Sequence, residues 1–265
     1  MPDGWLIRAA QLTRRPGKLH AGPVRRNWYI LAGLLIVGLS NGSGQVARTP
    51  NRVLDEREKA EVQFVSFALD DVQKTWDRLL PEQEKIPYRH AKLVLFRNEY
   101  PSACGEAKRV AGPFYCPGDE KVYLDLGFFT ELKQRFGAPG EFAQAYVIAH
   151  EIGHHVQKLM GIEGRERRLQ QQRPGEANEL SVRLELQADC FAGIWANSTR
   201  QRNLVDPRDI TAAIRAAAAV GDDRLQRLQR GYANPDSFTH GTSAQRVTWF
   251  RKGYDSGKIA ACNTF

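Results

Sequence analysis

The sequence predicts an α+β domain, and three observations support this prediction. Apolar residues recur at spacings of three and four along several long segments, which is typical of amphipathic helices. Two short segments, AKLVLF at 91–96 and KVYLDL at 121–126, are typical of β-strands. The chain has 265 residues, 42% of them hydrophobic, so it can bury a core. Two or three strands with five or six helices give the α+β class.

The first predicted elements are a long helix and the two strands. The helix covers 54–80, and Pro81 is expected to end it. Its apolar positions are Val62, Val65, Leu69, Val72, Trp76 and Leu79. The strand at 121–126 alternates valine and leucine with tyrosine and aspartate, which places the two sets on opposite faces. A short helix over 128–136, ended by a glycine, is expected next.

The second half of the chain is predicted to be mainly helical. One helix covers 141–160 and is closed by a glycine, and another covers 176–197 after a proline. Asp206, directly before a proline, is a good N-cap for a helix over 207–220. The segment 235–253 begins as a loop and continues as a helix. The chain has no internal repeats, so these elements are expected to belong to one domain.

The N-terminal part of the chain is expected to attach the domain to a membrane. Residues 1–27 form a basic tail, and residues 28–46 begin with the apolar run WYILAGLLIVGL. A basic flank before an apolar run predicts a cytoplasmic N-terminus and an extracytoplasmic domain. We interpret 28–46 as a transmembrane signal-anchor because SNGSGQVA is a poor cleavage site, with a cleaved signal peptide and a secreted domain as the alternative. Residues 47–53 are then a linker, and residues 54–265 form the domain on the periplasmic side of a bacterial plasma membrane.

The net charge of +8 does not indicate a nucleic-acid-binding protein, because most of it lies in the tail. Residues 1–27 hold six basic side chains against one acidic side chain, which leaves a net charge of +3 for the other 238 residues. A nucleic-acid-binding domain would carry a basic stripe on its folded part, and none stands out. We therefore expect the membrane as a partner, and no nucleic acid.

The four cysteines agree with export of the domain. They are Cys104, Cys116, Cys190 and Cys262. An even number of cysteines in an exported domain predicts disulfide bonds, and three pairings are open from sequence alone. Cys104 and Cys116 bracket a loop that contains glycine and proline, so we favour a bond between these two and, by remainder, a bond between Cys190 and Cys262.

The segment HEIGH on the helix at 141–160 predicts a metal site. His150 and His154 are four residues apart, so both lie on one helix face and their imidazoles can reach one zinc ion at about 2.0–2.1 Å. Glu151 lies about 100° around the helix, where it can approach a water molecule without binding the metal. The alternative is an ordinary core helix with hydrogen-bonded histidines. His155 points away from the shared face, and we expect it to pack or to hydrogen-bond.

A third ligand is expected from the helix at 176–197, because catalytic zinc takes three protein groups. Glu185 follows His154 by 31 residues and shares a helix face with Asp189. Both carboxylates lie among apolar residues, where an unpaired charge is costly. We assign Glu185 as the third ligand, and Asp189 as the acceptor that orients a ligand histidine.

Four motifs in the same order resemble the bacterial neutral zinc metallopeptidase family, a branch of the zincins. They are GPFYCPGDEKVYLDLGFF, HEIGHHVQ, ELQADCFAG and DSFTHGTSAQR, and the resemblance covers residues 55–265. It implies a zincin-like domain in which a small sheet with an edge strand packs on helices, and it places VYLDL as the strand beside the cleft. The E-x-x-A-D pattern is similar to that of the CAAX prenyl proteases, which implies that Glu185 is the third zinc ligand. Their similar THP…R segment nominates His240 as a catalytic residue, against the alternative of a surface histidine.

The sequence therefore predicts a zinc-dependent metalloendopeptidase with one catalytic Zn²⁺ and a protein or peptide substrate. Glu151 would act as general base, and His240 would help to stabilise the oxyanion. One alternative is a catalytically silent zincin that acts as a membrane-tethered binding module. Another is a basic anchored protein that binds nucleic acid or anionic lipid through residues 8–26.

Overall fold

The computed structural model describes residues 55–108, 112–134 and 141–265. The N-terminal tail, the apolar segment and the linker that the sequence predicts lie outside these ranges, as does the end of the helix predicted before the HEIGH segment. Within these ranges, no helix combines the length and the apolarity that crossing a bilayer requires. The described part is mixed α and β and mostly helical, as the sequence predicts.

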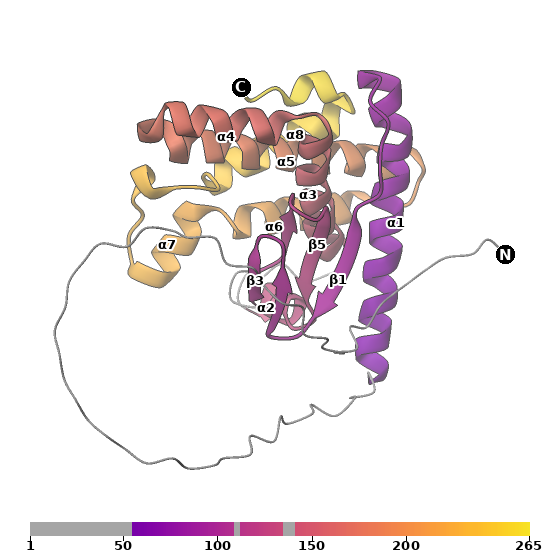
Figure 1. Cartoon of the computed structure of the whole chain (residues 1–265). Coiled ribbons are helices and arrows are strands. Elements are labelled where there is room, and N and C mark those ends of the chain that lie inside the picture. Colours follow the sequence, from indigo (N-terminus) through magenta and orange to yellow (C-terminus); the bar gives the residue numbers. More distant parts are fainter. Residues whose placement is uncertain (1–54, 109–111, 135–140) are drawn as a thin grey trace, which may run out of the picture. The chain divides into compact units, whose positions relative to one another are not determined.

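The main sheet has three strands in the order β1-β5-β4, and Figure 1 shows β1 and β5 side by side. Strand β1 (Lys92–Phe96) pairs in parallel with β5 (Lys121–Asp125), and β4 (Phe114–Cys116) pairs antiparallel on the other side of β5. Both predicted strands are therefore present. Because β5 has partners on both sides, the placement of VYLDL at the sheet edge beside a cleft was wrong. That edge is β4, and three residues are too few to show an alternating pattern.

Both faces of β5 are buried, because a second small sheet covers the side of Tyr123. Strands β2 (Glu99–Ser102) and β3 (Gly105–Lys108) form an antiparallel pair that the sequence did not predict. The ring of Tyr100 on β2 lies 6.1 Å from that of Tyr123. The disulfide Cys104–Cys116 ties the turn of this pair to the end of β4. The favoured pairing of these two cysteines is confirmed.

Helix α1 (Glu56–Glu84) runs beside the sheet and is longer than predicted (Figure 1). It begins with a capping box in which the side chains of Asp55 and Glu58 each bond the other's backbone N–H. Pro81 lies inside the last turn, so the prediction that it ends the helix was wrong. A proline removes only its own N–H donor, and the later residues still donate to carbonyls upstream. The backbone N–H of Lys85, for example, bonds the carbonyl of Pro81 at 3.2 Å.

The other α-helices of the described residues form the larger layer of the domain. They are α2 (Phe128–Gln134), α3 (Glu141–Leu159), α4 (Ile162–Gln172), α5 (Ala177–Gln201), α6 (Pro207–Ala219), α7 (Asp222–Arg230) and α8 (Ser243–Ser256). Helices α3, α5, α6 and α8 match predicted segments, and Asp206 caps α6 as expected. Helices α4 and α7 were not predicted.

Helices α5 and α8 cross in direct backbone contact. A Cβ atom on Gly193 would overlap the carbonyl oxygen of Phe250, and one on Gly253 would overlap that of Cys190. No residue larger than glycine fits at this crossing. The disulfide Cys190–Cys262 closes the same region, which confirms the second favoured pairing. The crossing fixes α8 against α5, and the side chains near the beginning of α8 can therefore reach the site described below.

Candidate active site

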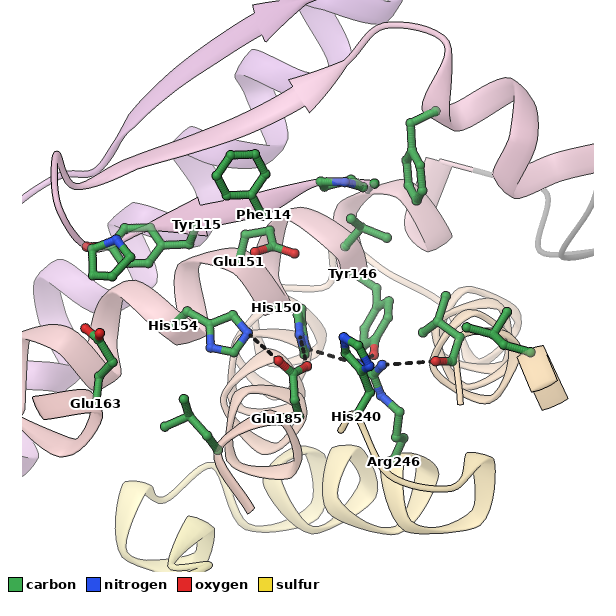
Figure 2. Close-up of a pocket in the computed structure, with 18 of the residues that line it drawn as sticks. Phe114, Tyr115, Tyr146, His150, Glu151, His154, Glu163, Glu185, His240 and Arg246 are labelled. Carbon is green, nitrogen blue, oxygen red and sulfur yellow. Dashed lines mark hydrogen bonds and ion pairs between the residues drawn. The ribbon is translucent and has the colours of Figure 1, made fainter. Parts of the chain in front are cut away.

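The two histidines of HEIGH lie one turn apart on α3 and face one cleft (Figure 2). Their ring centroids are 4.8 Å apart and the ring planes are perpendicular. On the opposite side of the helix, Ile148 and Ile152 are fully buried in the core. The apolar packing of α3 therefore holds the backbone that carries His150 and His154 in a fixed position.

Helix α5 approaches α3 closely at the glycine of HEIGH. An added Cβ on Gly153 would lie 3.0 Å from the carbonyl oxygen of Ala188, tighter than ordinary contact. Glu185 precedes Ala188 by about one helical turn, so the close approach carries its carboxylate to the histidines. The glycine of the motif thus has a structural role that the histidine spacing does not reveal.

The three predicted ligands come together. The two oxygens of Glu185 lie 3.1 Å from His150 Nε2 and 3.4 Å from His154 Nε2. One ligand atom from each of the three residues falls within 4.8 Å of the others. Tetrahedral coordination at the usual zinc distances separates two ligand atoms by roughly 3.3 Å. Two nitrogen ligands and one carboxylate at these separations fit a zinc ion.

The charges of the site also suit a cation. Burial lowers the pKa of His150, but the carboxylates of Asp189 and Glu185 outweigh it and raise this pKa to about 10. Burial raises the pKa of Glu185, but the imidazoles of His154 and His150 outweigh it and hold this pKa well below its usual range. The carboxylates therefore favour positive charge between them, which protons on the imidazoles or a metal ion can supply.

Asp189 lies behind His150 and is completely buried. Its Oδ1 accepts a hydrogen bond from His150 Nδ1 at 3.0 Å and another from the hydroxyl of Tyr146. Arg246, at the start of α8 and 3% exposed, donates to both carboxylate oxygens at 2.8 and 2.9 Å. With Nδ1 donating to Asp189, Nε2 of His150 faces Glu185, to which it donates when protonated, and it is the nitrogen that can bind a metal once it loses this proton.

Glu151 is buried against the protein and lines the cleft. In Figure 2 it lies on the β4 side of the histidines, and Glu185 lies on the α5 side. The cleft has a volume of about 1070 Å³ and is bordered by β4 through Phe114 and Tyr115. The edge strand beside the site is therefore β4, and a carboxylate stands between this strand and the two imidazoles.

His240 lines the same cleft, and Asp222 at the beginning of α7 holds its loop. One oxygen of Asp222 accepts from the backbone N–H groups of Thr239, His240 and Gly241 at 2.7, 2.6 and 3.1 Å. The other oxygen lies 3.2 Å from His240 Nδ1. The sequence did not assign a role to Asp222. An aspartate at the first turn of a short helix after a glycine was its only local signal.

His155 lies on the other side of α3, fully buried. Its Nδ1 accepts from the hydroxyl of Tyr115 at 2.8 Å, and its Nε2 donates to the carbonyl of Arg89. Tyr115 belongs to β4, so this histidine ties the edge strand to the helix that carries the site. The predicted packing and hydrogen-bonding role of His155 is confirmed.

Comparison with known proteins agrees with this arrangement. The model of a family described as "Putative neutral zinc metallopeptidase" matches residues 31–265. The chain belongs to this family. The resemblance that the four motifs indicate is thus confirmed at the level of the family, and the family implies a peptidase that uses zinc.

Relatives of this chain are found in Escherichia coli and Mycobacterium tuberculosis. "Uncharacterized protein YpfJ" of Escherichia coli (strain K12) is 47% identical over 234 residues, which cover 88% of this chain and 81% of the relative. "Uncharacterized protein Rv2575" of Mycobacterium tuberculosis is 44% identical over 207 residues, which cover 74% and 68% of the two chains. No solved structure matched the chain.

Proposed function

We propose that this metallopeptidase is a zinc-dependent endopeptidase that hydrolyses peptide bonds in the cleft between β4 and α3. The main observation behind this proposal is that His150, His154 and Glu185 place three possible ligand atoms within 4.8 Å of one another, in the cleft that Glu151 also lines. The membership in the family supports zinc as the metal and a protein or peptide as the substrate.

Zinc held by these three residues would act as a Lewis acid and would lower the pKa of a bound water molecule toward about 7. Glu151 accepts the proton of the attacking water and passes it to the leaving amine. Its position supports this role, since it lies in the cleft next to the first ligand and makes no hydrogen bond or ion pair with another described residue. Asp189 keeps the proton of His150 on Nδ1, which leaves Nε2 to bind the metal.

His240 donates a hydrogen bond to the carbonyl oxygen as that oxygen gains negative charge. Asp222 supports this role because it fixes both the backbone around His240 and the Nδ1 side of its ring. Loss of one such donor typically lowers the rate by roughly 10²–10³. Among the described residues, β4 pairs with β5 on one side only and lines the cleft, which supports binding of the substrate as an added extended strand.

We further propose that residues 28–46 anchor the enzyme in the plasma membrane with residues 54–265 outside the cytoplasm. Two disulfide bonds in the domain support this location, because disulfides persist in oxidising compartments. Secretion after cleavage remains the alternative, and N-terminal sequencing of the mature chain distinguishes the two.

The test compares Glu151→Gln with the wild type in the purified full-length chain. We expect the variant to bind one zinc ion, as the wild type does, and to cleave a peptide library roughly 10²–10⁴-fold more slowly. Glu163→Gln is the matched control, because Glu163 lines the same cleft but pairs with Arg167. A Glu151→Gln chain that held zinc and cleaved at the wild-type rate would contradict the mechanism. A wild-type chain that bound zinc and cleaved no peptide would favour the silent binding module.

A further inference from the structure

Helix α7 carries two leucines that do not pack on the core of the described residues. The helix has the sequence DDRLQRLQR, and its apolar side chains are Leu225 and Leu228. Both line the cleft that holds the three ligands, and Leu228 is 64% exposed. Neither belongs to the hydrophobic clusters or to the apolar residues that pack against them. An amphipathic helix normally turns its apolar side to the core, whereas the leucines of α7 face the cleft.

Polar contacts hold α7 in place instead. Asp222 accepts three backbone hydrogen bonds from the His240 loop, and Asp223 accepts from the backbone and hydroxyl of Ser243 at 2.8 and 2.9 Å. Gln226 donates to Ser237 at 3.0 Å and accepts from the backbone of Asn234 at 2.9 Å. These contacts anchor the helix without its leucines, which remain available to a ligand.

The leucines continue an apolar wall that reaches the site. Val220, at the end of α6, lines the cleft with them, and Arg246 lies 3.4 Å from its carbonyl oxygen. The apolar residues Phe128 and Val147 line the same cleft. Glu163 lies at the other end of the row of site residues, across the ligands from His240 (Figure 2). The side of the cleft toward α7 therefore presents three apolar side chains beside the polar Gln229, and the far end carries a carboxylate.

We propose that the wall formed by Leu225, Leu228 and Val220 binds a large apolar side chain of the substrate, next to the scissile bond on the side of His240. This inference rests on the proposed peptidase function and names its substrate class: peptides with leucine, phenylalanine or a similar residue at that position. The occupant is a peptide because the wall is continuous with the cleft that holds Glu151 and the ligands. The same Asp222 side chain connects α7 to the His240 loop. The proposed apolar wall and the proposed oxyanion donor are therefore held in place by one residue.

The test measures binding and cleavage separately. A peptide series in which one position at a time is leucine, phenylalanine, glutamine or serine is titrated into full-length zinc-loaded Glu151→Gln, and fluorescence anisotropy gives the Kd. We expect one position at which the apolar peptides bind roughly 10- to 100-fold more tightly than the polar ones. In the active chain, kcat/KM should prefer the same residues at the same position.

The variants Leu228→Gln and Leu225→Gln should reduce this preference by about tenfold. Leu204→Gln is the matched control, because Leu204 is 54% exposed and lies outside the cleft. Unfolding in urea checks that each variant is folded. The inference is overturned if no position shows an apolar preference, or if the preference survives both leucine variants. It is also overturned if these variants alter only self-association or vesicle binding. If the Kd values showed an apolar preference but the wild type cleaved no peptide, the proposed peptidase function would be refuted, and the proposal that this wall binds an apolar side chain would stand.

Discussion

Replacement of Asp189 by asparagine removes a buried negative charge that pairs with Arg246 and accepts a hydrogen bond from His150. The carboxylate is fully buried, 2.8 Å from Arg246 Nε and 3.0 Å from His150 Nδ1. Arg246 is 3% exposed, so the variant leaves a guanidinium without its counter-ion in the interior. An unpaired buried charge costs about 3–5 kcal/mol of the free energy of unfolding. Loss of the acceptor behind a ligand histidine weakens zinc binding by about 10–100-fold.

Urea unfolding of the zinc-free full-length chain measures the first effect, and competition with a chromophoric zinc chelator measures the second. The double variant with Arg246→Gln should lose less stability than Asp189→Asn alone, because no charge is then left unpaired. Asp71→Asn is the matched control: Asp71 is buried and pairs with Arg202, away from the cleft, so only stability should fall. A loss of stability below about 1 kcal/mol with unchanged zinc affinity would refute the reasoning.

Three further predictions follow from the same structure. Burial raises the pKa of Asp222, but hydrogen bonds from the His240 ring and from backbone N–H groups outweigh it and lower this pKa below 3.8. Asp222→Asn should therefore cost about 1–3 kcal/mol at pH 7. Urea unfolding should show that the difference in the free energy of unfolding between the wild type and this variant shrinks as the pH falls below 3.8. The reason is that these hydrogen bonds stabilise the folded chain only while the Asp222 carboxylate is ionised. Gly153→Ala should weaken zinc binding about tenfold in the chelator assay, because its Cβ meets the backbone of Ala188, whereas Gly164→Ala has room and should not. Replacing both cysteines of the disulfide that spans 72 residues with serine should destabilise the chain by about 4 kcal/mol, against about 3 kcal/mol for the one that spans 12 residues, as measured by thermal unfolding.

The long helices could be predicted because their signals are local. Helices α3 and α6 show apolar periodicity over many turns, and Asp206 before a proline marks the beginning of α6. The β4 strand and the β2–β3 pair could not be predicted, because strands of three or four residues are too short to show an alternation of apolar and polar side chains. Helix α7 was missed for a different reason, since it has only two leucines and these face the cleft.

Some residues of the candidate site could also be predicted from local patterns, and others could not. The spacing of His150 and His154 on one helix is sufficient to predict two ligands, and Glu185 follows from a carboxylate on an apolar helix face. What Arg246 contacts depends on the crossing of α5 and α8, which no local pattern reveals. The role of Asp222 likewise depends on a loop that returns to the beginning of α7. The proposed metal ligands are thus marked by their spacing in the sequence, whereas the residues that hold them in place are marked only by tertiary contacts.

The balance of charge around the histidines argues for a divalent ion. Three carboxylates surround them, those of Glu151, Glu185 and Asp189, and the guanidinium of Arg246 offsets one. With neutral imidazoles the group carries a net charge of −2, which is costly at this depth of burial. Protons on both imidazoles cancel this charge, in agreement with the raised pKa values of both histidines. A zinc ion in the proposed site would supply the same charge of +2 and would leave the imidazoles unprotonated as ligands, so the carboxylates and Arg246 suit a divalent ion as well as two protons.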